Sequence, residues 1–206
     1  MAEEETKNDF EVQGLFPTPV YVTQRDSGLD LTEQKEIEDI IRGGFPPGMA
    51  VTCTIDSYIF NNPKLKKLKE FCELHVNRIG AQLKAEEKEL EFYITQSWIN
   101  VVKPGKNHPP HYHSNSIISG VFYVSTIEHD NLIFHDPFVD NGPIKINEPL
   151  LFALGVSNYQ LVLFPSWMKH GVDVNPSTKN RISISFNTFA KGNFGEKETL
   201  NELILR

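Results

Sequence analysis

The hydrophobic pattern changes its period near residue 92, and this change constrains the fold more than any other feature. Between residues 63 and 89, apolar side chains recur at three- and four-residue steps, which is typical of an amphipathic helix. Asn62 and Pro63 supply a cap and a first-turn proline for it. From Phe92 onward the pattern is alternating or briefly apolar, with Gly, Pro, Asn and Asp between the runs, as in strands.

These patterns predict a mainly β fold, in which a double-stranded β-helix (jelly roll) core is backed by N-terminal α-helices. A first strand is expected over residues 16–23, and helices over 31–42 and 63–89. The later strands are expected over residues 93–102, 117–125, 131–135, 143–146, 159–164 and 181–188. We interpret residues 1–206 as one domain, with helical support over 10–91 and the jelly-roll core over 92–190. The acidic residues 1–9 are expected to be disordered.

Composition excludes some classes of partner and compartment. The net charge of −7 argues against a nucleic-acid backbone as the main partner, because such binders carry a basic stripe. The only cysteines, Cys53 and Cys72, do not indicate a disulfide framework. No signal peptide or long apolar run is visible, so neither secretion nor a membrane span is predicted, and the expected location is the cytoplasm.

A cluster of histidines indicates a metal site. Residues 107–124, NHPPHYHSNSIISGVFYV, place His111 and His113 at the mouth of a strand-like run. Side chains two positions apart on a strand share a face, about 6.6 Å apart along it, so both imidazoles can reach one ion. A third histidine, His170, follows an apolar run that places it near a core, and Arg181 comes after it. An open three-ligand site leaves room for a cosubstrate and dioxygen, as in non-heme iron oxygenases.

The strand that begins at Arg181 alternates strictly between polar and apolar residues. Its polar positions are Arg181, Ser183, Ser185 and Asn187, and its apolar positions are Ile182, Ile184 and Phe186. An exposed sheet surface would account for this pattern. The alternative, favoured by the apolar flank of His170, is that the polar face lines a pocket, where arginine can hold a carboxylate bidentately.

Two long motifs resemble the iron(II)- and 2-oxoglutarate-dependent dioxygenase superfamily. HYHSNSIISGVFYV and LFPSWMKHGVDVN…RISISFN are similar to signatures of a phage and bacterial branch of 2OG-Fe(II) oxygenases, which is related to the prolyl 4-hydroxylases. The matched part covers about residues 98–189, and LFPTPVY resembles the opening of that branch. The resemblance implies a jelly-roll enzyme that uses iron(II), 2-oxoglutarate and dioxygen, without a side-chain general base.

Carried over to this chain, the resemblance implies iron ligands at His111, His113 and His170. The usual motif is His-x-Asp or His-x-Glu, so His113 stands where the family has a carboxylate. With three neutral imidazoles the iron keeps its full charge, and a dianionic 2-oxoglutarate must compensate it. Asp136 is an alternative carboxylate ligand, and His108 is interpreted as a loop residue or pocket lining rather than a ligand.

The same resemblance implies the residues that hold 2-oxoglutarate. Arg181 and Ser183 match the superfamily's arginine-x-serine pattern, and Tyr123 matches a tyrosine that assists the arginine in prolyl hydroxylases. Asn100, on the preceding strand, is a candidate contact for the near end of the cosubstrate. A hydroxylase of a protein side chain or a small molecule is the main hypothesis, with peptidyl proline as the first candidate. A cupin-like zinc or manganese enzyme and a non-catalytic jelly-roll module are the alternatives.

Overall fold

The computed structural model describes residues 18–46, 52–82, 90–136 and 151–206. The predicted disorder at residues 1–9, the strand at 143–146 and the helix beyond residue 82 lie outside these residues. Helix α1, Leu31–Arg42, has the predicted bounds. Asp30 caps it, accepting from the backbone of Glu33, while the Glu33 side chain accepts from the Asp30 backbone N–H.

The second helix begins as a tighter turn. Two 3-10 turns, η1 (Ile59–Asn61) and η2 (Pro63–Leu65), lead into α2, Lys66–Gln82. The Asn62 side chain accepts a hydrogen bond from the backbone of Lys64, as predicted for a cap. Within the described residues, no helix has the length and apolar character needed to cross a bilayer.

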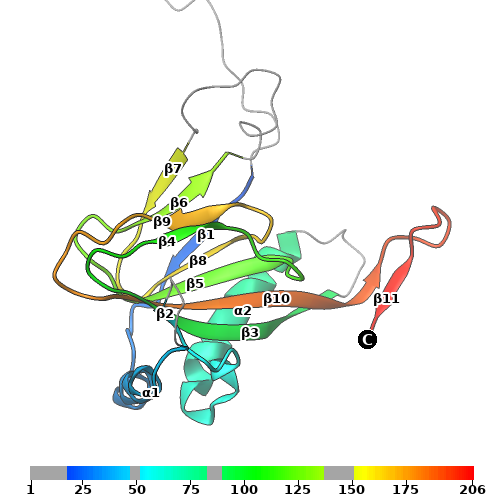
Figure 1. The fold of residues 1–206 in the computed structure, drawn as a ribbon. Coiled ribbons are helices and arrows are strands. Elements are labelled where there is room, and N and C mark those ends of the chain that lie inside the picture. Colours follow the sequence, from blue (N-terminus) through cyan, green and yellow to red (C-terminus); the bar gives the residue numbers. More distant parts are fainter. Residues whose placement is uncertain (1–17, 47–51, 83–89, 137–150) are drawn as a thin grey trace, which may run out of the picture.

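The strands form two antiparallel sheets, which confirms the predicted jelly-roll class (Figure 1). The large sheet has the order β1 (Tyr21–Gln24), β8 (Gln160–Pro165), β5 (Ile118–Ser125), β10 (Arg181–Phe194), β3 (Leu90–Val102) and β2 (Thr52–Cys53). A further strand, β11 (Leu203–Leu205), pairs antiparallel with the end of β10. The small sheet has the order β4 (His108–His111), β9 (His170–Val172), β6 (Asn131–His135) and β7 (Leu151–Gly155).

The large sheet is buried on both faces. Both helices lie on one side of it and the small sheet lies on the other (Figure 1). Apolar side chains of α2 such as Leu68 and Val76 pack with Ile184 and Phe186 of β10 in the main core. A second cluster lies on the other face, and its members are Val121, Tyr123, Leu132, Phe134, Val162 and Phe164. Because the side chains of β10 alternate between its two faces, its apolar residues lie in the main core and its polar residues face the space between the sheets.

Some elements differ from the predicted ones. The strands β4, β7, β9 and β11 were not predicted as separate elements, and β10 extends to Phe194. Strand β4 has the sequence HPPH and β9 has HGV, and neither carries a period that can be recognised. Strand β7, LFALG, is a continuous apolar run, which periodicity alone cannot distinguish from a helix.

The close pairing of β5 with β10 depends on Gly120. Gly120 lies opposite Phe186, and a Cβ atom at residue 120 would overlap the Phe186 ring. We expect Gly120→Ala to lower the free energy of unfolding by about 1–3 kcal/mol, because a packed core resists added volume. Denaturant titration measures this. Gly155→Ala is the control, since its added Cβ would meet only Asn131, at 3.9 Å; equal losses in both variants would contradict the packing explanation.

Candidate metal centre

Three histidines from two segments meet between the sheets. His111 is the last residue of β4 and His170 the first of β9, and the two are paired across these antiparallel strands. His113 follows β4 directly. Gly171 permits the close approach of the strands, because a Cβ there would lie 2.9 Å from the carbonyl oxygen of His108. The structure thus brings the three predicted metal ligands together.

The ring nitrogens of these histidines converge. Nε2 of His111 lies 3.1 Å from Nε2 of His113. One potential ligand atom from each of His111, His113 and His170 lies within 4.8 Å of the others. Two nitrogens bound at right angles, each about 2.1 Å from an ion, are roughly 3 Å apart. The spacing of this cluster is therefore suitable for a divalent metal.

The Nδ1 contacts set the tautomer of each ring. Nδ1 of His111 donates to the carbonyl of Pro109 at 2.9 Å, and Nδ1 of His170 donates to that of Met168 at 2.9 Å. Nδ1 of His113 lies 2.6 Å from Oδ1 of Asn187. Because carbonyl oxygens only accept, each ring carries its proton on Nδ1 and its lone pair on Nε2. The lone pairs face the space where an ion would be held, so the residues fit a metal.

Burial keeps two of these rings neutral. It lowers the pKa of His170 to about 3 and the pKa of His113 to about 4. Both rings are therefore uncharged at neutral pH and available as ligands. Within the described ranges, His111, His113 and His170 are the only group of this kind, and Asp136 is not part of it.

Asn187 is the nearer of two side chains that contact Nδ1 of His113; the other is Ser119, whose Oγ lies 2.9 Å from it. Nδ2 of Asn187 lies 3.3 Å from Oε1 of Gln96, which fixes the amide so that Oδ1 faces the imidazole. Loss of such a partner typically weakens metal binding by about ten- to a hundredfold. We expect this loss for Asn187→Ala and recovery of most of it in Asn187→Asp, which restores an acceptor. Metal titration by calorimetry measures it, and unchanged affinity in the alanine variant would contradict this role.

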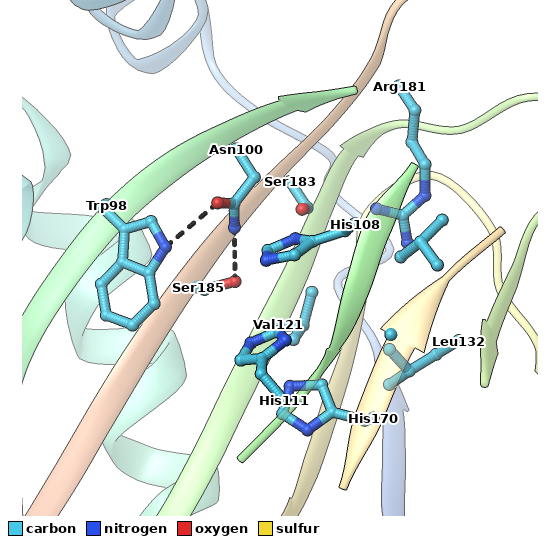
Figure 2. Close-up of a pocket in the computed structure, with 12 residues that line it drawn as sticks. Trp98, Asn100, His108, His111, Val121, Leu132, His170, Arg181, Ser183 and Ser185 are labelled. Atoms are coloured by element: carbon cyan, nitrogen blue, oxygen red, sulfur yellow. Dashed lines mark hydrogen bonds between the residues drawn. The ribbon is translucent and has the colours of Figure 1, made fainter. Parts of the chain in front are cut away.

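Arg181 lies at the other end of the cavity (Figure 2). Its guanidinium is buried, and its Nε donates to both carboxylate oxygens of Asp130, each at 2.8 Å. Its Nη2 is also buried and has no hydrogen-bond partner among the described residues. An unpaired buried donor costs free energy. This group is therefore suited to accept an additional anionic ligand.

Tyr123 adds a second unpaired donor at the same place. The Arg181 guanidinium lies over its ring, 5.0 Å from the centroid. The Tyr123 hydroxyl is buried without a partner in the described chain, and burial raises its pKa to about 12. The hydroxyl therefore keeps its proton and can donate. Two unpaired donors, Nη2 and this hydroxyl, fit a carboxylate.

The polar face of β10 lines the cavity rather than solvent. Ser183 and Ser185 contribute to its wall, as does Asn100 of β3 (Figure 2). Asn100 donates to the hydroxyl of Ser185 at 2.8 Å and accepts from the indole N–H of Trp98 at 3.1 Å. The alternative that this face is an exposed sheet surface is excluded, because Ser183 and Ser185 are buried.

The cavity is nearly filled in this conformation. Its volume is about 20 Å³, enough for about one water molecule. The ring of His108 stacks on His111, 4.5 Å between centroids and 11° from parallel, and lies in the view between the histidines and Arg181 (Figure 2). Of the two interpretations of His108, pocket lining is the one observed, because His108 begins β4 and lines the cavity. A ligand that reaches from the histidines to Arg181 requires His108 or its neighbours to move.

A wider groove opens on the other side of His113. It has a volume of about 500 Å³. Its lining includes His113, the exposed aromatic rings of Tyr112 and Trp167, and the rings of Pro19 and Pro165. The sequence analysis did not identify this groove, because its walls come from segments far apart in the chain.

No local pattern in the sequence indicates that Asp130 belongs to the site. It precedes β6 and resembles any loop aspartate in the sequence, and only the fold places it on Arg181. The adjacent His129 is exposed, as expected for a turn, with its side chain 90% accessible.

Three converging histidines at an open site resemble the facial triad of non-heme iron oxygenases, in which two histidines and one carboxylate hold the metal. Residues 96–187 match the family described as "Putative 2OG-Fe(II) oxygenase". This match, over less than half of the chain, confirms the resemblance to iron(II)- and 2-oxoglutarate-dependent dioxygenases seen in the sequence. The cofactors of this class are iron(II), 2-oxoglutarate and dioxygen. No curated protein matches the sequence.

Solved structures share this fold at low sequence identity. The carbocyclase SnoK from nogalamycin biosynthesis has a TM-score of 0.56 and 13% identity, over 85% of this chain and 82% of SnoK. A prolyl-4-hydroxylase from Pseudomonas putida has a TM-score of 0.54 and 16% identity, over 82% of this chain and 92% of that one. HygX from Streptomyces hygroscopicus, solved with nickel, 2-oxoglutarate and hygromycin B, has a TM-score of 0.54 and 10% identity, over 83% and 82%.

Proposed function

We propose that the chain is a hydroxylase that couples decarboxylation of 2-oxoglutarate to hydroxylation of a substrate C–H bond, with a peptidyl prolyl residue as the substrate. The proposed iron ligands are His111, His113 and His170. The proposed contacts of 2-oxoglutarate are Arg181, Ser183, Tyr123 and Asn100.

One observation carries this proposal. The histidine lone pairs converge at one end of the cavity, and Arg181 lines the other end with its Nη2 unpaired. The hydroxyl of Tyr123, whose ring lies against the Arg181 guanidinium, is also buried and unpaired. A ligand with a chelating end and a distant carboxylate satisfies both ends at once. This is the chemistry of 2-oxoglutarate. A zinc isomerase or a structural jelly-roll module has no need of the unpaired donors, so they disfavour both alternatives.

The protein residues bind and orient rather than transfer protons. Iron(II) and 2-oxoglutarate, when bound, supply the oxidation: one oxygen atom enters succinate, the other enters the substrate, and carbon dioxide is released. Arg181 and Tyr123 would fix the far carboxylate, which sets the direction of the cosubstrate in the cavity. The apolar walls given by Val121 and Leu132 exclude water from the site.

The groove beside His113 supports a peptide substrate. Grooves lined by aromatic rings favour extended proline-containing segments, whose rigid backbone loses little entropy on binding. Tyr112 and Trp167 supply such rings next to the metal cluster. The similar fold of the Pseudomonas putida prolyl-4-hydroxylase is in keeping with this choice. The competing assignment is that the enzyme hydroxylates a side chain other than proline in the bound peptide.

The first experiment is an anaerobic titration of the metal-free protein with iron(II) and then with 2-oxoglutarate, in which calorimetry measures the binding of each. We expect one equivalent of each, with 2-oxoglutarate binding only weakly when metal is absent. Succinate production on admission of oxygen is then measured with and without proline-containing peptides. Binding of zinc without any binding of 2-oxoglutarate would contradict the proposal and favour the zinc enzyme. Stimulation by peptides lacking proline would contradict only the substrate assignment.

A further inference from the structure

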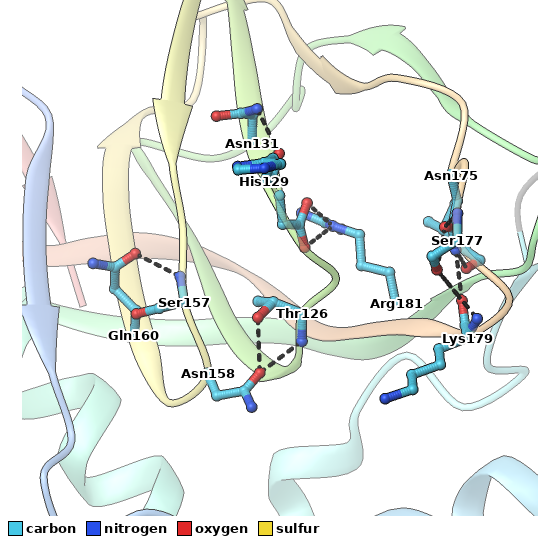
Figure 3. A network of polar contacts seen from close by, with 12 residues as sticks. Thr126, His129, Asn131, Ser157, Asn158, Gln160, Asn175, Ser177, Lys179 and Arg181 are labelled. Carbon is cyan, nitrogen blue, oxygen red and sulfur yellow. Dashed lines mark hydrogen bonds and ion pairs between the residues drawn. The ribbon is translucent and has the colours of Figure 1, made fainter.

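Arg181 has a buried acidic partner that the metal site alone does not explain. Asp130 stands between the exposed His129 and strand β6, yet its side chain is only 2% accessible, the same as that of Arg181. Figure 3 shows Arg181 reaching from β10 to this loop, with dashed lines marking its two contacts. The desolvation cost of burying two charges can exceed their attraction, so stability alone is a weak explanation for this pair.

The pairing leaves one side of the guanidinium open. Asp130 receives both of its hydrogen bonds from Nε, so Nη2 stays unpaired and buried. The Tyr123 ring lies under the guanidinium plane. The carboxylate on one edge and the ring on one face restrict the rotation of the Arg181 group, which holds Nη2 in place for a ligand.

The pair also changes the charge of the site. In the usual His-x-Asp arrangement, the charges of iron(II), one carboxylate ligand, 2-oxoglutarate and the arginine cancel. Here His113 replaces that carboxylate, and without another acid the loaded site would keep one positive charge. Asp130 restores the balance from the opposite end of the cavity. Uncompensated charge in a buried site is unfavourable, and an acid at either position 113 or position 130 would offset it.

We propose that Asp130 is a positioning residue for Arg181 and supplies the negative charge that position 113 lacks. This inference rests on the proposed function, because it assumes that iron(II) and 2-oxoglutarate bind together. It links the metal site at His113 to the Asp130–Arg181 pair, because the charge missing at the first is supplied at the second.

The test exchanges the charge between the two positions. Asp130→Asn keeps an acceptor for Nε but removes the charge, so the dissociation constant of 2-oxoglutarate should fall about tenfold. His113→Asp adds a charge beside the metal, and the constant should rise about tenfold. The double variant should bind nearly as the wild type does, because the two changes compensate. Calorimetry with saturating nickel(II), which does not turn over, measures all four proteins without relying on activity.

Asp173→Asn is the matched control. Asp173 lines the same outer pocket as Asp130 but is exposed, so solvent screens its charge and 2-oxoglutarate binding should not change. Shifts of equal sign in the two single variants, or no compensation in the double variant, would overturn the inference. If Asp130→Asn does not fold, His113→Asp decides alone: an unchanged dissociation constant in that variant overturns the charge exchange. Absence of 2-oxoglutarate binding in all four proteins would instead refute the proposed function.

Discussion

Replacement of His170 by alanine is expected to abolish stoichiometric iron(II) binding. His170 supplies one of three converging nitrogens, and its ring is buried against Phe134 and Phe164. Losing a hydrogen bond to a metal ligand typically weakens metal binding by about ten- to a hundredfold. Removing the ligand itself should weaken metal binding by more than that. Anaerobic titration with metal analysis measures the stoichiometry and affinity.

The control for this variant is His129→Ala. His129 is exposed and lies outside the cluster, so its loss should leave metal binding unchanged. A melting curve of each metal-free variant separates a lost ligand from a lost fold. Retention of one equivalent of iron in folded His170→Ala would refute the assignment of the metal site.

Replacement of Arg181 by alanine is expected to raise the dissociation constant of 2-oxoglutarate about a hundredfold while metal binding persists. A charge-assisted hydrogen bond contributes about 1.5–3 kcal/mol, and Nη2 is positioned to make one. Calorimetry with nickel(II) gives both constants in one protein. Because alanine leaves the Asp130 carboxylate buried without its partner, Arg181→Lys is measured beside it, and it should bind 2-oxoglutarate with intermediate affinity.

Lys191→Ala serves as the control for this change. Lys191 is a basic residue on the same strand, but it is exposed and pairs with Glu91 at the surface. Its loss should not alter 2-oxoglutarate binding. A dissociation constant that is the same in the Lys191 and Arg181 variants would remove Arg181 from the site.

The sequence carries the helical layer and the polar face of β10 in its local patterns. Helix α1 was predicted with its observed bounds, because its apolar positions and the Gly43 that follows its last residue lie within a few residues of each other. Likewise, the strict alternation after Arg181 predicted that one face differs from the other. Only the folded protein shows that this polar face is enclosed by a second sheet.

Features that depend on distant pairing were not predictable. Asp130 and Arg181 are 51 positions apart, and His113 and its partner Asn187 are 74 apart. Neither pair has a local signal: Asp130 resembles many loop aspartates, and Asn187 is one of several polar residues on the same face of β10. The short strands β4 and β9 were missed for a related cause: a few residues of pairing are stabilised by their neighbours and not by their own sequence.

The metal ligands come from segments that are far apart in the chain, so a bound ion would also stabilise the fold. His111 and His113 come from one edge of the small sheet, and His170 comes from β9, far along the chain. A bound ion therefore acts as a cross-link that closes the long loop between these segments, as a disulfide would. We expect amide hydrogens of β4 and β9 to exchange faster when iron is scarce, while those of the large sheet stay protected. Iron supply would then set the lifetime of the small sheet as well as the activity of the site.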